Sequence, residues 1–283
     1  MFAVLLLAVG VAWWISQTRG GGGDQALAVL KDIRSQGLGA FWGDQPNYAW
    51  YLATKADGEM VGWRVNLRMP LPNEAGYVGI SHQRGIDEQG KWQISEERWQ
   101  LDPTAQMGSY EARVGRGRRI EPQLFINFDK GLLTVSVPTH SDKQAAPANY
   151  LPEGLLPLAI RLTHQSGKKA SFGMIINEVA IHELAAKKGQ LHVVPLAITP
   201  QADGVLLNYA SAFEVHVTLD EQGEIQAEEA GGSGIRWQRA TPEQVVKQFP
   251  EAGGYLPKQD DVLPGNLERE PEDISPDEPV LAI

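Results

Sequence analysis

The sequence predicts a mainly β protein: a strongly curved antiparallel sheet, or half-barrel, of about ten strands with hairpin connections. Three observations predict this class. Short turn signals recur between runs rich in β-branched and aromatic residues, several of these runs alternate apolar and polar residues, and no long helical pattern separates one run from the next. One N-terminal helix, one C-terminal helix and an N-terminal membrane helix complete the expected architecture.

Residues 1–18 are expected to be a membrane anchor or a signal segment, followed by a glycine-rich linker over residues 19–23. The segment "MFAVLLLAVGVAWWI" carries no charged side chain, and the next three residues bring it close to the ~20 residues that span a bilayer. It lacks the basic n-region and small-residue cleavage site of a secretory signal, and its two Trp residues suit a membrane interface. We therefore expect a retained anchor, with a cleaved signal and a helix buried in a soluble core as alternatives.

A single β-rich domain is expected over residues 24–257, and it begins with a helix over Asp24–Gln36. The glycine that follows marks the end of this helix. Its expected apolar stripe consists of Leu27, Leu30 and Ile33.

The clearest strand pattern spans Val61–Met69. One face carries Val61, Trp63, Val65, Leu67 and Met69, and the other carries Gly62, Arg64, Asn66 and Arg68. Alternation of this kind is typical of an antiparallel sheet with one face on a core and the other in contact with water.

The tetrapeptide "DEQG" occurs twice, at Asp87–Gly90 and Asp220–Gly223. Asp opens a turn by bonding to its own backbone and Gly supplies a positive φ, so we interpret both copies as hairpin turns rather than as a functional motif. Before the second copy, alternation over Tyr209–Leu219 predicts one half-buried strand.

The segment "PTHSDKQAAPANYLPEGLLP" is expected to connect two groups of strands and to lead into an apolar run, Leu155–Leu162. Further on, Ile176–Gly189 fits either a short helix or two β segments. The C-terminal helix is expected over Thr241–Phe249, with Thr as its cap and Gln244 completing a capping box. Residues 258–283 are acidic and rich in Pro, which predicts disorder.

Composition narrows the function. A net charge of −10 argues against a nucleic-acid partner, and the absence of Cys excludes disulfides and thiol catalysis. We expect no metal or cofactor, because the nearest approach to a zinc motif, "HELAA" at His182, has Ala186 where a second His is required. No nucleophile elbow or phosphate loop is present, so no catalytic residue is assigned and the protein is not expected to be an enzyme.

Two sets of residues are candidates for ligand contact. Strand aromatics and a neighbouring Val either pack in the core or line a cleft for an apolar ligand under the curved sheet. These candidates are Trp63, Val65, Trp99, Phe125, Phe172, Tyr209 and Phe213. In the one basic cluster, Arg116, Arg118 and Arg119 either contact an anionic group or lie in a solvated strand or loop.

The pattern resembles the periplasmic lipoprotein-carrier type of protein, in which an antiparallel sheet curls over helices to shelter lipid. The helix Asp24–Gln36, the meander from Tyr48 to Trp99 and the strands after "YLPEGLLPLAIRL" carry this resemblance. It contains no diagnostic motif that would transfer a functional residue. A retained anchor would also differ from a mobile carrier and would favour a tethered role.

These observations predict a membrane-anchored domain, exocytoplasmic in the manner of a periplasmic protein, that binds an apolar or lipid-like ligand. The expected partners are a membrane, through residues 1–18, and a lipid or an envelope protein. Two alternatives stay open: a non-catalytic structural or assembly protein of the cell envelope that binds a protein partner, and an envelope hydrolase.

Overall fold

The computed structural model describes the chain from residue 22 to residue 255 with five gaps, namely residues 22–86, 91–116, 119–175, 193–209, 213–232 and 234–255. Residues 1–18 and 258–283, the first "DEQG" turn and the whole of Ile176–Gly189 lie outside these ranges. Of the helices that the structure describes, none combines the length and the apolar character needed to cross a membrane.

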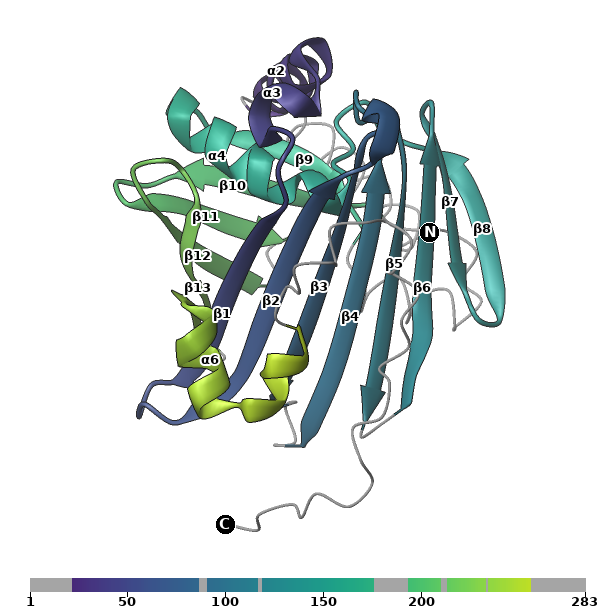
Figure 1. Ribbon diagram of the computed structural model, residues 1–283. Helices are drawn as coiled ribbons and strands as arrows, with labels where there is room; N and C mark the ends of the chain where they lie inside the picture. Colours follow the sequence, from purple (N-terminus) through teal and green to yellow (C-terminus); the bar gives the residue numbers. More distant parts are fainter. Residues whose placement is uncertain are drawn as a thin grey trace, which may run out of the picture.

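The described residues form one antiparallel sheet of fourteen strands, in the order β8-β7-β6-β5-β4-β3-β2-β1-β14-β13-β12-β11-β10-β9 (Figure 1). The sheet is not closed, because its order ends at β8 and β9. The strands are β1 Asn47–Lys55, β2 Met60–Pro70, β3 Tyr77–Ile86, β4 Trp92–Leu101, β5 Met107–Arg116, β6 Arg119–Asp129, β7 Leu132–Val137, β8 His140–Ala145, β9 Ala170–Met174, β10 Val194–Pro200, β11 Gly204–Tyr209, β12 Phe213–Leu219, β13 Ile225–Ala230 and β14 Ile235–Ala240.

The predicted class, a large antiparallel sheet with hairpin connections, is confirmed, whereas the expected number of about ten strands was too low. Some strands lack a hydrophobic pattern: β8 reads "HSDKQA" and lies at an edge of the sheet. The predicted strand Tyr209–Leu219 is in fact two strands, because the chain turns back after Tyr209 and Phe213 pairs with it across a hairpin. Period-2 alternation continues through such a hairpin, so it does not reveal the turn.

Two meanders, β1–β8 and β9–β14, become one sheet because β1 pairs with β14, from Trp50 opposite Ala240 to Lys55 opposite Ile235. The first and last strands of the described chain therefore lie in the middle of the sheet. This long-range pairing brings the two meanders together around a shared interior.

The predicted helices at the two ends of the β-rich domain are present. Helix α2 (Gly23–Gln36) ends at Gly37, whose φ of 76° and N–H bond to the Ile33 carbonyl terminate it. Its stripe differs from the prediction, because Leu27 is exposed. The buried residues are Ala26, Val29, Leu30 and Ile33.

Helix α6 (Pro242–Gln248) has the predicted capping box. The Thr241 N–H donates to Gln244 Oε1 at 2.8 Å, and the Gln244 N–H donates to Thr241 Oγ1 at 3.3 Å. Pro250 does not stop the chain's helical path, since it opens a 3₁₀ helix, η3 (Pro250–Tyr255).

The structure contains two helices that the sequence did not predict, α3 (Leu38–Trp42) and α4 (Leu156–Ser166). The second contains most of Leu155–Leu162, the apolar run into which the predicted connection leads. Pro157 hid this helix, although Pro is well tolerated in the first turn because the N–H it lacks has no intrahelical partner there. Gly167, in the left-handed conformation, ends α4.

The two faces of the sheet pack against different elements. The inner face is the one that carries Arg64, Asn66 and Arg68 of β2, and the outer face carries Trp63 and Val65. On the inner side, α2 and α4 pack with β9–β12 in the largest apolar cluster, and β5–β7 form a second cluster. On the outer side, α6 and η3 cover Trp50, Trp63 and Val65.

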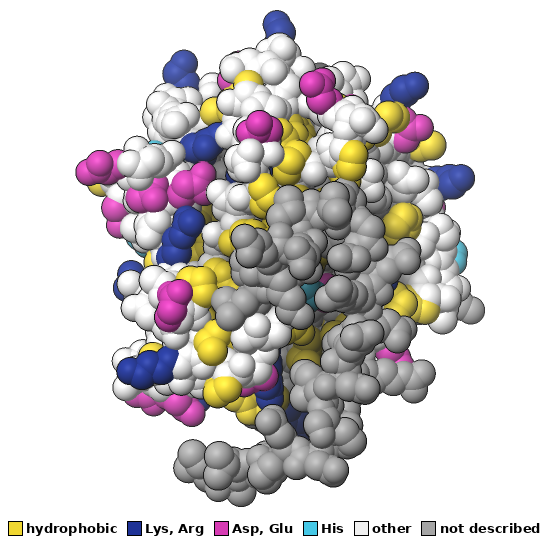
Figure 2. Space-filling view, in the orientation of Figure 1, with side chains coloured by type: hydrophobic (Ala, Val, Ile, Leu, Met, Phe, Trp, Pro, Cys, Tyr) yellow, Lys and Arg dark blue, Asp and Glu magenta, His cyan; other side chains and the backbone are white. Residues whose placement is uncertain are grey.

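Figure 1 shows this arrangement, with α2, α3 and α4 gathered at one end of the sheet and α6 lying against β1 and β2. In the same orientation, Figure 2 shows basic and acidic side chains interspersed over the described residues of the face in view.

Candidate ligand-binding cavity

A cavity of about 360 Å³ lies against the inner face of the sheet, between β1–β4 on one side and β11–β13 on the other. Helix α4 and the 3₁₀ turn before it, η2 (Glu153–Leu155), cover one end together with Trp42 of α3. Strands far apart in the order of the sheet face the same space, so the sheet curls around it. The volume lies in the ordinary range for small-molecule sites, roughly 300–1,000 Å³.

The two sides of the cavity differ in chemistry. The polar side comes from β1–β4 and carries Asn47, Tyr51, Arg64, Asn66, Arg68, Ser81, Gln83 and Glu97. The apolar side comes mainly from α4 and β11–β13 and carries Leu156, Leu158, Ile160, Leu207, Tyr209, Val215, Val217 and Ile225. Two charged groups, Glu224 and Glu228, also reach the cavity from β13 and the turn before it.

Arg64, on the polar side, has an acidic partner and two aromatic neighbours. One terminal nitrogen lies 2.7 Å from Glu228 Oε2, and its guanidinium lies 4.5 Å from the Tyr51 ring and 5.1 Å from the Trp237 ring. Burial acts to lower the pKa of Arg64, but Glu228 and Tyr51 together raise it above its ordinary value. This guanidinium is therefore held in place as a permanent cation.

Two polar atoms on the inner face of the same strand are buried without a hydrogen-bond partner among the described residues. They are Nε of Arg64 and Oδ1 of Asn66. Because a buried polar atom without a partner costs free energy, each of them is a place where a bound molecule could supply the missing hydrogen bond.

Arg68 differs from Arg64 in lacking an acidic partner. Its guanidinium lies 4.8 Å from the Trp42 ring, and no carboxylate in the described part of the chain lies within ion-pair distance of it. Burial lowers the pKa of Arg68; the nearby Arg161 lowers it further, while Glu224 acts in the opposite direction. An unpaired, partly buried cation of this kind favours an anion in the space beside it.

Trp42, against which Arg68 lies, belongs to an aromatic cluster. The ring centre of Trp42 lies 5.1 Å from that of Tyr77 and 5.6 Å from that of Trp99. Trp99 lies so close to Gly79 that a Cβ at that glycine would come within 2.1 Å of the indole. The glycine therefore permits the position of Trp99 in the cavity wall.

The second "DEQG" turn also contributes to the cavity. As predicted, it is a hairpin turn, in which Asp220 Oδ1 accepts the N–H groups of Gln222 and Glu224 and Gly223 has a φ of 79°. A Cβ at Gly223 would lie 2.6 Å from the Arg161 side chain, so this glycine allows Arg161 to pass. Arg161 then lies 3.5 Å from Glu224.

The predicted ligand-lining residues are distributed over several environments. Trp99 and Tyr209 line the cavity, and Phe172 is buried in the core against α2 and α4. Trp63 and Val65 face the opposite side of the sheet, where α6 and η3 cover them. Phe125 and Phe213 are exposed. Ligand contact by Trp99 and Tyr209 stays a prediction.

The predicted anion-contacting arginines lie at the β5–β6 turn. Arg116 ends β5, Arg119 begins β6, and the two are paired across the hairpin, while Arg118 lies outside the described residues. Among the described residues, these two strands contribute nothing to the cavity lining.

The arginines that do reach the cavity, Arg64, Arg68 and Arg161, were not assigned a function from the sequence. The alternation of β2 had placed Arg64 and Arg68 on a face in contact with water. The signal in the sequence that could have indicated a polar site was the presence of two arginines on one strand face with Asn66 between them.

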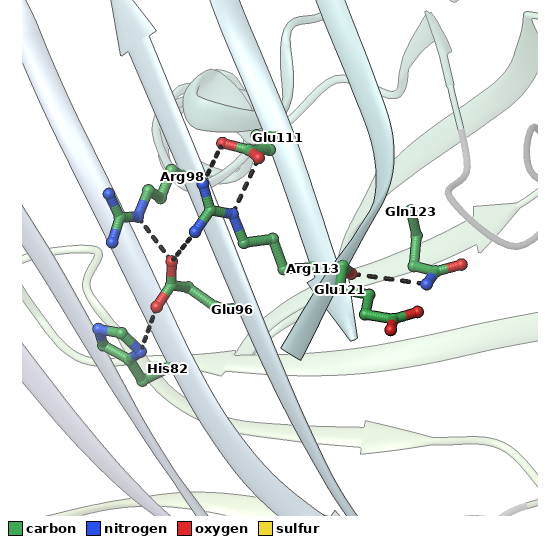
Figure 3. A network of polar contacts seen from close by, with 7 residues as sticks. All are labelled: His82, Glu96, Arg98, Glu111, Arg113, Glu121 and Gln123. Carbon is green, nitrogen blue, oxygen red and sulfur yellow. Dashed lines mark hydrogen bonds and ion pairs between the residues drawn. The ribbon is translucent and has the colours of Figure 1, made fainter. Parts of the chain in front are cut away.

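A second polar cluster lies on the outer face of β3–β5 (Figure 3). Glu96 is only 7% exposed. Its Oε1 lies 2.6 Å from Arg98 Nε and 3.9 Å from a terminal nitrogen of Arg113, which also pairs with Glu111 at 2.8 Å. Its Oε2 lies 3.2 Å from His82 Nδ1, an ion-pair distance without hydrogen-bond geometry. The next residue, Glu97, faces the opposite side of the sheet and lines the cavity.

Burial lowers the pKa of His82; Glu96 raises it and Arg98 lowers it further. The His82 ring also packs against Tyr255 of η3, with ring centres 4.5 Å apart, and Tyr255 in turn packs against Trp63. We interpret this cluster as the connection between the outer face of the sheet and η3. In the described part of the chain, no group of three or more His, Asp or Glu side chains is placed to hold a metal ion.

Comparison with solved structures gives resemblances of fold, of which two are described. No protein-family model matches the chain, and no curated protein matches its sequence. A β-barrel-like protein of the domain of unknown function DUF1849 from Brucella abortus is 10% identical, with a TM-score of 0.46, over 69% of this chain and 96% of that one. A DUF1089 family protein from Pseudomonas aeruginosa is 17% identical, with a TM-score of 0.32, over 56% of this chain and 86% of that one.

The fold and the cavity together define this chain as a curved antiparallel-sheet protein with an internal cavity that is polar on one side and apolar on the other. The coarse part of the expected resemblance to lipoprotein carriers, a large antiparallel sheet, is present.

Proposed function

We propose that the protein binds a small amphipathic, lipid-like molecule in the cavity between β1–β4 and β11–β13. The observation that carries this proposal is the division of the cavity into a polar and an apolar side. A purely apolar ligand would make no hydrogen bonds with the polar side of the cavity. A purely polar ligand would make no apolar contact with the other side.

The apolar side suits a hydrocarbon portion. Several of its members, including Tyr209, Val215 and Ile225, are only partly buried although they pack against the main core. A hydrocarbon chain against them would remove apolar surface from water, which contributes about 25 cal/mol per Å².

The polar side suits a head group, because the buried Arg64 Nε and Asn66 Oδ1 lack partners and Arg68 lacks a counter-charge. As part of the same proposal, residues 1–18 would tether the protein to a membrane, which would keep the cavity close to a source of lipid. Binding of an envelope protein partner is the alternative function, and it does not require an occupied cavity.

Native mass spectrometry of the full chain, purified from its own host in a non-ionic detergent that is removed in the gas phase, tests the proposal. We expect a reproducible additional mass that organic extraction releases as an amphipathic molecule. Ser81→Phe, which places a ring in the cavity, should lower the occupied fraction about tenfold or more. Ser136→Phe on β7, away from the cavity, is the matched control.

A thermal melt must first show that both variants fold. A folded Ser81→Phe protein with unchanged occupancy would contradict the proposal. So would a wild-type protein that carries no extracted molecule and does not take up added lauric acid or lauryl alcohol.

A further inference from the structure

We infer that the head group of the ligand is an anion, a carboxylate or a phosphate, and that Arg68 holds it beside Trp42. This inference rests on the proposed function and adds the chemical class of the ligand. It depends on the distribution of charge along the polar side of the cavity, on the orientation of Arg68 and on the residues that surround it.

The charges on the polar side are matched at one end and unmatched at the other. Around Arg64, Glu228 forms an ion pair at 2.7 Å and the charge of Glu97 also acts on the guanidinium. Around Arg68, the acting charges are those of Arg161 and Glu224, and Glu224 already lies 3.5 Å from Arg161. This second end therefore holds two guanidinium groups and one carboxylate.

The stacked position of Arg68 leaves its donors available. The guanidinium carbon of Arg68 lies 4.8 Å from the centre of the Trp42 ring, and no described residue accepts a hydrogen bond from its N–H groups. The N–H groups of Arg point outwards in the guanidinium plane, in the fork that matches two oxygens of a carboxylate or phosphate. Trp42 is itself packed against Tyr77 and Trp99, with ring centres 5.1 Å and 5.6 Å away.

Arg161 completes this end of the cavity. Its other contact is a hydrogen bond from a terminal nitrogen to the Phe41 carbonyl oxygen at 3.4 Å, which fixes it beside the same opening. Glu153 also lines the cavity, from η2, but its charge is not among those that act on Arg68. A bound anion would balance the excess positive charge of Arg68 and Arg161 without displacing the Arg64–Glu228 pair.

The test measures binding of lauric acid, lauryl phosphate, lauryl alcohol and inorganic phosphate to the full chain by equilibrium dialysis. The two lauryl anions should bind about tenfold or more tightly than the alcohol, because each gains a charge-assisted hydrogen-bond pair. In Arg68→Gln this preference should fall to about threefold or less while the affinity for the alcohol stays unchanged. Arg68→Lys should keep part of it, since the charge remains but the fork is lost.

Arg236→Gln, at an exposed position of β14, is the matched control and should leave all four affinities unchanged. Equal binding of acid and alcohol by the wild-type protein, or an acid preference that survives in a folded Arg68→Gln variant, would overturn the inference and leave the proposed function standing. Failure of every lauryl compound to bind would overturn the proposed function itself. If inorganic phosphate binds as tightly as lauryl phosphate, the site binds the anion without using the hydrocarbon portion of the ligand. That result would also contradict the proposed binding of an amphipathic molecule.

Discussion

The two faces of strand β2, formed by alternate residues, differ in polarity and in what they contact. On the outer face, Trp63 and Val65 are buried under α6 and η3. On the inner face, Arg64, Asn66 and Arg68 line a cavity. The apolar face is thus covered by two short helices from the far end of the chain, whereas the polar face lies inside the curl of the sheet.

This comparison shows that polarity alone does not tell which face of a strand is exposed. The outer face gains stability by removing apolar side chains from water. Both faces hold buried polar atoms without a hydrogen-bond partner among the described residues, for example Nε1 of Trp63 on the outer face and Nε of Arg64 on the inner face, and each such atom costs stability. Only on the inner face do these atoms belong to residues that line the cavity, so the inner face is the one to test for binding and the outer face the one to test for folding.

The largest expected effect is that of Trp63→Ala on stability. Trp63 is fully packed against Tyr255 and Val245 in the outer-face cluster, so its removal should lower the free energy of unfolding by about 3–5 kcal/mol. Urea unfolding followed by circular dichroism measures this. Leu132→Ala, at an exposed position, should change stability by less than about 0.5 kcal/mol.

The fraction of Trp63→Ala that folds should bind lauric acid as the wild-type protein does. Loss of binding without loss of stability would mean that the outer face, and not the inner face, holds the ligand.

Gly79→Ala should have the next largest effect, because the new methyl group would overlap the Trp99 indole. We expect a loss of about 1–3 kcal/mol and a change in Trp fluorescence as the ring is displaced. Gly85→Ala on the same strand is the control, since its Cβ would meet nothing closer than 3.7 Å. If the two variants show the same stability and the same Trp fluorescence, the position that we describe for Trp99 is wrong.

Arg64 and Arg68 should differ in their contributions to stability. Arg64→Gln removes the partner of Glu228 and should cost about 1–2 kcal/mol, between the values for exposed and for fully buried pairs. Arg68→Gln removes an unpaired cation and should leave the free energy of unfolding unchanged or slightly higher. Chemical denaturation of both variants decides the point, and a larger loss for Arg68→Gln would show that Arg68 serves the fold.

The smallest expected effect concerns His82 and pH. Burial lowers the pKa of His82 below its ordinary value of 6.5. The unfolded chain therefore takes up this proton at a higher pH than the folded protein, so the contribution of His82 to stability is complete above pH 6.5 and is lost as the pH falls through its folded pKa.

His82→Gln should make the melting temperature fall less steeply between about pH 7 and about pH 5. His216→Gln, on exposed surface, is the control. If the melting temperatures of wild type and His82→Gln depend on pH in the same way, protonation of His82 does not contribute to the pH dependence of stability.

Much of the local structure could be predicted from the sequence. The end of α2 at Gly37, the capping box at Thr241 and the turn at Asp220 each depend on residues within a few positions of one another. Helix α4 was missed because Pro157 resembled a break in the pattern. The hairpin between β11 and β12 was missed because alternation alone does not mark a reversal of the chain.

The candidate site could be predicted only in part. Trp99 and Tyr209 were recognised by their aromatic character and lie in the cavity wall. Arg68 and Arg161 were not, because an arginine on the polar face of a strand or helix usually points to solvent. Their neighbours come from α3 and from the turn before β13, and no spacing in the sequence records that proximity.

The sequence by itself determined the antiparallel class, the alternation of β2 and the caps and turns, because each is a local consequence of backbone geometry and side-chain period. Only the tertiary structure decided which face of the sheet became the inside. That choice depends on the pairing of β1 with β14 and on the docking of α6 and η3 against Trp63. Both are contacts between the two ends of the described chain, and they are set by the curl of the whole sheet and by the packing of surfaces that it brings together.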